Sequence, residues 1–144
     1  MTDRLQGRSI KPALHLHLGC SFAEVRRGAI QIRQFLQKAG LSEKDTWACE
    51  LAFTEGCNNA VQHTPAAETG KKIVINLSLD GGQVELRIND HSPGCTYPEA
   101  ASLPPAEHER GRGIFLIQSL MDDVTYTRRD SSNCLILKKA LTGI

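Results

Sequence analysis

The sequence predicts an α+β fold, a two-layer α/β sandwich in which helices cover one face of a mixed, mostly antiparallel sheet. Two observations predict it. Strand-like stretches occur once near the start and then as two hairpin-like pairs, whereas helix-like stretches lie between them. The chain has 144 residues, of which 40% are hydrophobic. This length is enough to bury one hydrophobic core but too short for two full domains. We therefore expect a single domain over residues 1–144.

The first predicted element is a strand over residues 13–19. Leucines alternate there with alanine and histidines, which is the period of a strand with one buried face. His15 and His17 then point away from the buried face, as solvent-facing or second-layer side chains.

Two helices are predicted next. Ser21 and Ser42 are each followed three positions later by an acidic residue, the spacing of a capping box at a helix start. The first apolar helical pattern ends at Gly40, and the second continues to about His63. The Thr64-Pro65 step stops the second helix, because a residue before proline disfavours the helical region.

Two hairpins are expected further along. Residues 72–79 and 83–89 are rich in β-branched and aliphatic residues and flank Asp80-Gly81-Gly82, which is typical of a turn. Residues 123–129 and 133–139 alternate in the same way around a second turn. Both pairs are interpreted as antiparallel hairpins of one sheet.

The segment between the hairpins has a different character. Residues 90–110 hold four of the six prolines and show little periodicity, so we interpret about 91–110 as a lid. Gly111-Arg112-Gly113 then precedes an apolar run, Ile114 to Met121, that predicts a third helix.

Composition excludes several classes of function. Seventeen Lys and Arg against sixteen Asp and Glu give a net charge of +1, so no global field attracts nucleic acid or an anionic membrane. The five cysteines form no C-x-x-C pair and are interpreted as reduced cytosolic thiols. No apolar run approaches the roughly 20 residues of a membrane span. We expect a cytoplasmic protein with a local ligand site and no direct contact with nucleic acid or membrane.

The second helix carries the first candidate site. Glu55 and Asn59 lie one turn apart on one face, and an acid and an amide so placed can act together on a hydrated Mg²⁺ and its phosphates. Alternatively Glu55 pairs locally and Asn59 is a tolerated polar residue. His63, one turn further, is a candidate nucleotide-binding residue or complements the helix dipole.

The second candidate lies at the end of the predicted strand 83–89. Asp90 continues the parity of the buried residues, so its carboxylate is expected to face the helices and could accept a hydrogen bond from an adenine amine. Gly94 would let a flat base approach the backbone closely. The alternatives are an ordinary strand-end aspartate and an ordinary turn glycine.

The third candidate is the start of the last helix. With Gly111 and Gly113 before it, the free N–H groups of its first turn could hold phosphate, although two glycines alone are weak evidence. The candidate nucleotide-binding set here comprises Arg110, Gly111, Arg112, Gly113 and Ile114.

These motifs occur together in an informative order. Glu55-Gly56-Cys57-Asn58-Asn59-Ala60 resembles the E-x-x-x-N-A box of the GHKL ATPases, which include gyrase, histidine kinases and MutL. Asp90 through Gly94 is similar to their D-x-G-x-G box, and Gly111-Arg112-Gly113-Ile114 to their G-x-G-[LI] box. The resemblance extends from about Leu14 to Leu141. One departure is Ser92, which stands where the family has the first glycine of D-x-G-x-G.

The segment 111–124 and the residues before the first box are most similar to the anti-sigma-factor serine kinases of partner-switching systems. The resemblance implies the Bergerat ATP-binding fold, Mg²⁺ bridged by Asn59, adenine read by Asp90, and Glu55 as the catalytic base. It further implies an anti-sigma factor that sequesters a sigma factor, phosphorylates a serine of a STAS-type anti-sigma-factor antagonist, and forms a homodimer.

An alternative comes from another functional class. The chain could be a catalytically weak ATP-binding module, or a pure protein-binding module, that sequesters a partner. Ser92 favours this alternative, because the turn after Asp90 must be made differently from that of the family. Glu55 opposes it, because a pure binder does not need the acid.

Overall fold

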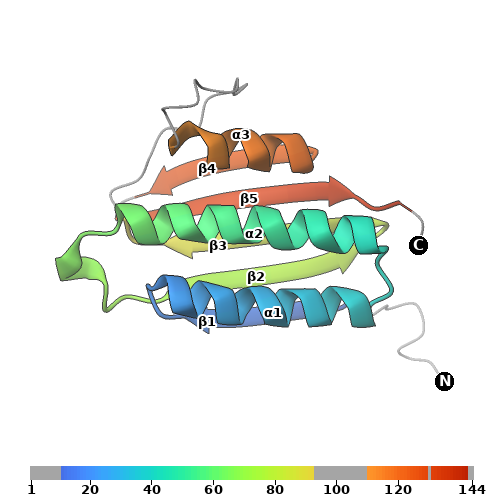
Figure 1. The fold of residues 1–144 in the computed structure, drawn as a ribbon, viewed down its shortest axis with the longest axis horizontal. Helices are drawn as coiled ribbons and strands as arrows, with labels where there is room; N and C mark the ends of the chain where they lie inside the picture. The colour runs from blue at the N-terminus through green and yellow to red at the C-terminus, as the bar shows by residue number, and fades with distance from the viewer. Residues whose placement is uncertain (1–10, 93–109, 130, 143–144) are drawn as a thin grey trace.

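The computed structural model describes residues 11–92, 110–129 and 131–142. In Figure 1 three helices lie in front of a five-stranded sheet with the strand order β1-β2-β3-β5-β4. The predicted two-layer α+β class is confirmed, and all pairings between the described strands are antiparallel. The elements are β1 (Ala13–Leu18), α1 (Phe22–Lys38), α2 (Glu43–His63), the 3-10 turn η1 (Ala66–Glu68), β2 (Ile73–Asp80), β3 (Gln83–Asp90), α3 (Arg110–Leu120), β4 (Asp123–Arg129) and β5 (Ser132–Ala140).

Both predicted hairpins are present. The β2–β3 turn is made by Gly81 and Gly82, whose φ angles of 60° and 79° are both positive, as a two-residue type I′ turn requires. In the second hairpin β5 returns between β4 and β3, so Asp90 at the end of β3 pairs with Asn133 near the start of β5. The sheet order therefore brings the ends of three strands together next to Asp90.

The core lies between the helices and one face of the sheet. The largest fully buried side chains come from both layers: Phe53, Ile32, Leu36, Ile73, Ile75, Leu77, Leu86, Ile88 and Leu137. The other sheet face carries the exposed side chains of His15 and His17, as the alternation predicted. Strands β2, β3 and β5 thus alternate buried residues with more exposed ones along their length.

Helix α2 packs very close to the sheet. A Cβ atom added at Gly56 would lie 2.9 Å from Ile88 Cδ1 and 3.0 Å from Leu135 Cδ2. Only glycine fits this contact without a shift of the core, so Gly56 sets the distance between α2 and the central strands.

The predicted capping box of α2 forms only in part. The Ser42 hydroxyl accepts a hydrogen bond from the Asp45 amide at 3.1 Å, as expected at an N-cap. The Asp45 carboxylate, however, turns away from the cap and accepts from the Thr142 amide at 2.7 Å. Asp45 therefore ties the segment after β5 to the start of α2.

The cap of α1 shows the same departure. The Ser21 hydroxyl accepts from the Glu24 amide at 3.2 Å, whereas Glu24 Oε1 accepts from the Gly19 amide at 3.0 Å. Arg27 donates to both Glu24 oxygens, at 3.1 and 2.8 Å. The side-chain hydrogen bond from Arg27, followed by that from the Gly19 amide, lowers the pKa of Glu24 from 4.5 to about 2.

One expectation about the helices is wrong. Helix α3 begins at Arg110 and not at Ile114, so the Gly-Arg-Gly segment forms its first turn instead of preceding it. Trp47 on the outer face of α2 is 58% exposed. The proposed lid, apart from residues 91, 92 and 110, lies outside the described residues. Among the described helices, none is long and apolar enough to cross a membrane.

Candidate functional site

Glu55 and Asn59 lie on the side of α2 that faces the first turn of α3. A Cβ atom added at Gly113 would lie 2.8 Å from Glu55 Oε1, and 3.7 and 3.8 Å from the Asn59 side-chain oxygen and nitrogen. Gly113 thus gives the two polar side chains room beside the α3 backbone. Backbone N–H groups in the first turn of a helix have no intrahelical acceptor, so this is a place where an anion can be held.

Asp90 lies at the end of β3 on the face covered by α2, and it is only 6% exposed. Its Oδ1 accepts three hydrogen bonds, from the Ser92 amide at 2.8 Å, the Ser92 hydroxyl at 2.7 Å and Asn133 Nδ2 at 2.9 Å. Among the described residues, all hydrogen bonds to this carboxylate end on Oδ1. Oδ2 is therefore left as an acceptor for a further donor.

Two residues that the sequence did not point to hold this arrangement. Asn133 is 1% exposed, and its Nδ2 also donates to the Ser92 carbonyl at 2.8 Å. Arg128 NH1 donates to Asn133 Oδ1 at 2.7 Å and to the same Ser92 carbonyl at 2.9 Å. Side chains from β4 and β5 thus fix both Asp90 and the chain that leaves β3. The signal that could have found Asn133 is its place opposite Asp90 once β3 and β5 are paired.

A small hollow joins the two halves of the site. Its polar lining residues are Asn59, His63, Asp90, Ser92 and Tyr126, and its apolar ones are Gly56, Ala60, Ile88 and Leu135. Its free volume is about 10 Å³, about enough for one water molecule. Asn59 lines this hollow and also lies next to Gly113. Glu55 lies next to Gly113 but does not line the hollow.

The remaining predicted residues are placed as follows. His63 Nδ1 is 2.8 Å from the Asn59 carbonyl, one turn back along α2, so the ring is held near the end of the helix. Gly111 lies in the first turn of α3 together with Arg110 and Arg112, and Ile114 follows half-buried. Gly94 and the side chains of Arg110 and Arg112 lie outside the described part of the chain.

Comparison with known proteins gives the family. The sequence profile of the histidine kinase-like ATPase domain matches residues 21–139. The chain belongs to this family. The predicted resemblance to GHKL ATPases and to the anti-sigma-factor kinases is confirmed: the serine-protein kinase RsbW of Bacillus mycoides is 27% identical over 110 residues, which cover 70% of this chain and 68% of the relative. The RsbW protein of Bacillus anthracis matches equally well.

Solved structures show the same fold. The crystal structure of the RsbU and RsbW domains of a Mycobacterium tuberculosis protein matches with a TM-score of 0.72 and 22% identity, over 93% of this chain and 34% of that chain. This chain therefore spans about a third of that protein. The SiaB-SiaC complex from Pseudomonas aeruginosa matches with a TM-score of 0.62 and 12% identity, over 90% of this chain and 88% of that chain.

The cysteine inside the first family box is a packing residue. Cys57 lies between Glu55 and Asn59 in sequence but points into the core, where it is fully buried. Burial, and after it the negative charge of Asp90, raises the pKa of the Cys57 thiol well above its usual value. A thiol held neutral in this way is neither a nucleophile nor a metal ligand.

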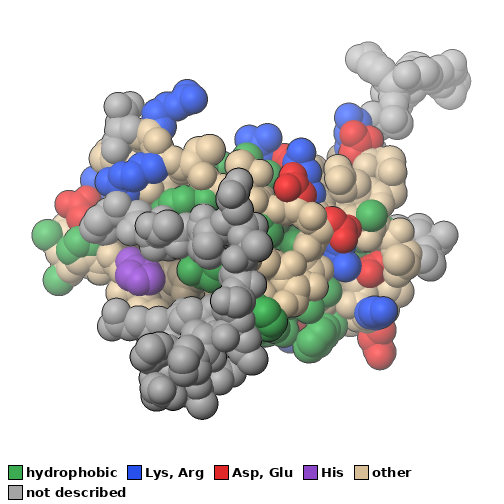
Figure 2. Space-filling model, turned by 90° about the horizontal axis from the view of Figure 1, so that it is seen from above, with side chains coloured by type: hydrophobic (Ala, Val, Ile, Leu, Met, Phe, Trp, Pro, Cys, Tyr) green, Lys and Arg blue, Asp and Glu red, His purple; other side chains and the backbone are tan. Residues whose placement is uncertain are grey.

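The rest of the described surface carries charge of both signs and no cluster of metal ligands. Figure 2 shows Lys and Arg interspersed with Asp and Glu on the side that is seen from above. Among the described residues, no group of three or more His, Cys, Asp or Glu could hold a metal ion.

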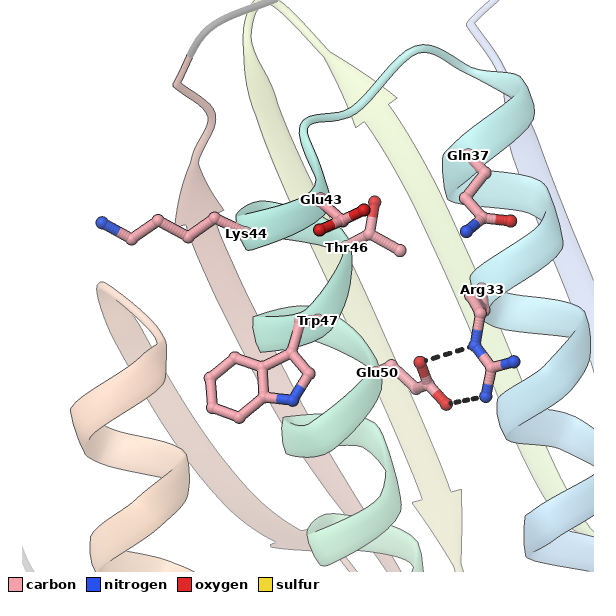
Figure 3. A pocket seen from close by; sticks show the side chains of 7 residues that line it. All are labelled: Arg33, Gln37, Glu43, Lys44, Thr46, Trp47 and Glu50. Carbon is pink, nitrogen blue, oxygen red and sulfur yellow. Dashed lines mark hydrogen bonds and ion pairs between the residues drawn. The ribbon is translucent and has the colours of Figure 1, made fainter.

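A larger hollow lies elsewhere on the helix layer. It has a volume of about 630 Å³ and is lined by Arg33, Gln37, Glu43, Lys44, Thr46, Trp47 and Glu50 from α1 and α2. Figure 3 shows Arg33 and Glu50 paired across the two helices, with both hydrogen bonds drawn, at 2.9 and 2.6 Å. None of the motif residues lies in it.

Proposed function

We propose that this chain is an ATP-dependent protein serine kinase that acts as an anti-sigma factor. The observation that carries the proposal is the position of Glu55 directly beside the backbone of Gly113. Its Oε1 would lie 2.8 Å from a Cβ atom if one were added to this glycine. A carboxylate beside Asn59 and the amide-rich start of α3 stands where a phosphoryl acceptor would meet a bound phosphate. The names of the relatives, serine-protein kinases at 27% identity, support the same activity.

Asp90 would read the base of the nucleotide. Its free Oδ2 can accept a hydrogen bond from the exocyclic amine of adenine, while Ala60, Ile88 and Leu135 supply apolar contacts. A base that carries an oxygen at this position would leave the buried carboxylate without a donor and bind more weakly.

Asn59 and the first turn of α3 would hold the phosphates. A bound Mg²⁺ would supply positive charge that offsets the charge of the phosphates. Asn59 offers an amide oxygen for this ion, and the first turn of α3, where backbone N–H groups lack intrahelical acceptors, lies beside Asn59 at Gly113. Because the hollow has only about 10 Å³ free, nucleotide entry requires its lining side chains to move apart.

Glu55 would act as the general base. A serine hydroxyl that approaches the terminal phosphate beside Gly113 can give its proton to Glu55, since the carboxylate is half-buried and directed there. Phosphoryl transfer depends mainly on positioning and charge stabilisation, so the remaining residues contribute by holding the nucleotide.

The biological setting follows from the same proposal. The phosphorylated partner would be a STAS-type anti-sigma-factor antagonist, and the sequestered partner a sigma factor. We further propose that residues 1–144 form one domain, that the chain forms a homodimer and that it acts in the cytoplasm.

The test is transfer of phosphate from γ-labelled ATP to an antagonist protein. Glu55→Gln should retain ATP binding but lower the transfer rate by about 10²–10⁴-fold, the usual contribution of a general base. Glu50→Gln is the matched control, because Glu50 lies on the same helix but pairs with Arg33 at the distant hollow. Unchanged transfer in Glu55→Gln would reject the assigned base.

A second candidate is a binding module without catalysis. Ser92 favours it, because its hydroxyl and amide both bind Asp90 Oδ1 where the family has a glycine. Thermal unfolding with and without Mg-ATP distinguishes the candidates. A shift without transfer to any antagonist would support the binding module, and a shift with transfer would support the kinase.

A further inference from the structure

His15 and His17 form a close pair on the open face of the sheet. They are two residues apart on β1, both side chains are exposed, and their Nε2 atoms are 2.8 Å apart. The ring centroids are 4.7 Å apart, with the ring planes inclined by 70°. The pair lies on the face opposite the helices, and therefore opposite the candidate nucleotide site.

A residue of β2 orients the first ring. Asn76 is the register partner of His15, and its Oδ1 is 2.5 Å from His15 Nδ1. An amide oxygen only accepts, so Nδ1 carries the proton in this contact. In neutral His15 the Nε2 atom is then unprotonated and has its lone pair directed at His17. A hydrogen bond that sets the tautomer in this way is the usual second partner of a metal-binding histidine.

We propose that His15 and His17 form a surface site for a divalent transition-metal ion of the Cu²⁺ and Ni²⁺ type. Metal–imidazole bonds of about 2.0–2.1 Å put two ligand nitrogens roughly 2.9 Å apart at a right angle and roughly 3.3 Å apart in a tetrahedron. The observed Nε2 separation of 2.8 Å fits the right angle, which square-planar and tetragonal ions prefer.

The surroundings are compatible with an ion. Val74 faces His17 across the β1–β2 pair and brings no charge. Arg87, the register partner of Asn76 on β3, is a cation on the same face, and its guanidinium is bound to Glu85 at 2.6 Å. The site has two protein ligands, and water completes the coordination. It needs no residue of the nucleotide site.

The experiment is calorimetric titration of NiCl₂ and of CuCl₂ into the full-length chain without a histidine tag and without nucleotide. Wild type should bind one ion at this site, and His17→Gln and His15→Gln should each weaken binding roughly 10-fold or more, because the second imidazole no longer acts within the same chelate. Asn76→Ala should weaken it about 10-fold through the lost orientation of His15. His63→Gln, which removes a histidine from another surface, should change nothing at this site.

The outcomes are distinct. Electron paramagnetic resonance of the Cu²⁺ form should show coupling to two imidazole nitrogens in wild type and to one in His17→Gln. Equal binding by wild type, His15→Gln and His17→Gln would overturn the proposal, as would the absence of binding in wild type. Circular dichroism of each variant checks that the exposed substitutions leave the fold intact.

Discussion

Asn133 Nδ2 donates a hydrogen bond to Asp90 Oδ1 at 2.9 Å across the β3–β5 pairing, in which the two residues are register partners. Both side chains are almost completely buried. The bond joins the residue proposed to read adenine to a residue that no motif contains. It directs the carboxylate so that Oδ1 faces the protein and Oδ2 remains for a ligand.

The first prediction concerns this bond. Asn133→Ala removes one of the three donors to Asp90 Oδ1 and one of the two donors to the Ser92 carbonyl, both in buried surroundings, so we expect the free energy of unfolding to fall by about 1–3 kcal/mol. ATP affinity should fall as well, because the carboxylate is no longer oriented. Urea unfolding and nucleotide titration measure the two effects. Thr127→Ala, on the exposed side of β4, is the control, and equal losses in both variants would contradict the prediction.

The second prediction concerns Gly113. In Gly113→Ala the new Cβ would come closer than 3 Å to the flexible end of Glu55 and would lie at ordinary contact distance, 3.7 and 3.8 Å, from the Asn59 amide, so the carboxylate can move aside. Alanine also favours a helix over glycine by about 1 kcal/mol, so stability should be kept or raised. Phosphate transfer should nevertheless fall, because Glu55 is displaced.

Gly56→Ala is the matched comparison for Gly113→Ala. Its Cβ would meet the packed side chains of Ile88 and Leu135 at 2.9 and 3.0 Å, where the core must move. We expect a loss of about 1–3 kcal/mol in the free energy of unfolding. Thermal and urea unfolding of both variants test the contrast. A loss of stability in Gly113→Ala as large as that in Gly56→Ala would contradict the predicted difference between the two glycines.

The third prediction is a pH dependence at Glu24. Its pKa is lowered from 4.5 to about 2, chiefly by the hydrogen bond from Arg27, so the folded state favours the ionised form. The stabilisation is fully present above about pH 4.5 and is lost as the pH falls toward 2. The stability difference between wild type and Glu24→Gln should therefore shrink over this interval. Denaturant unfolding from pH 7 to pH 2.5 measures it, and a constant difference would refute the role of Glu24.

The fourth prediction concerns Asp45, which is 1% exposed and accepts hydrogen bonds from the amide and the hydroxyl of Thr142. Asp45→Ala removes both bonds and should lower the free energy of unfolding by about 1–3 kcal/mol. Faster amide hydrogen exchange at Thr142 should accompany the loss. Glu43→Ala, an exposed substitution in the same first turn of α2, should leave exchange at Thr142 unchanged.

Local patterns in the sequence were enough to predict most of the helices, strands and turns. The strand period, the N-cap serines and the Gly81-Gly82 turn each depend on neighbours in the chain, so they could be predicted. The start of α3 could not be predicted in this way, because two glycines disfavour a helix locally. In the structure Gly113 is part of the helix and packs beside Glu55 and Asn59 of α2.

Contacts that depend on distant segments were also missed. Asn133 and Arg128 acquire their role only when β5 lies between β3 and β4, which no local pattern states. The Asp45 carboxylate was expected at the cap of α2, but a buried bond to Thr142 is available. Glu55, Asn59 and Asp90 were singled out by their type and order, and the roles proposed for them remain predictions.

The close contact at Gly56 limits which parts of the protein can move. With less than 3 Å between an added Cβ and Ile88, the backbone of α2 lies closer to the sheet than any residue with a side chain would allow without a shift. Asn59 and Asp90 are therefore carried by two elements, α2 and β3, that are packed directly against each other. Among the described elements, α3 meets a softer contact than this, because at Gly113 it faces the flexible end of Glu55 and not the packed core.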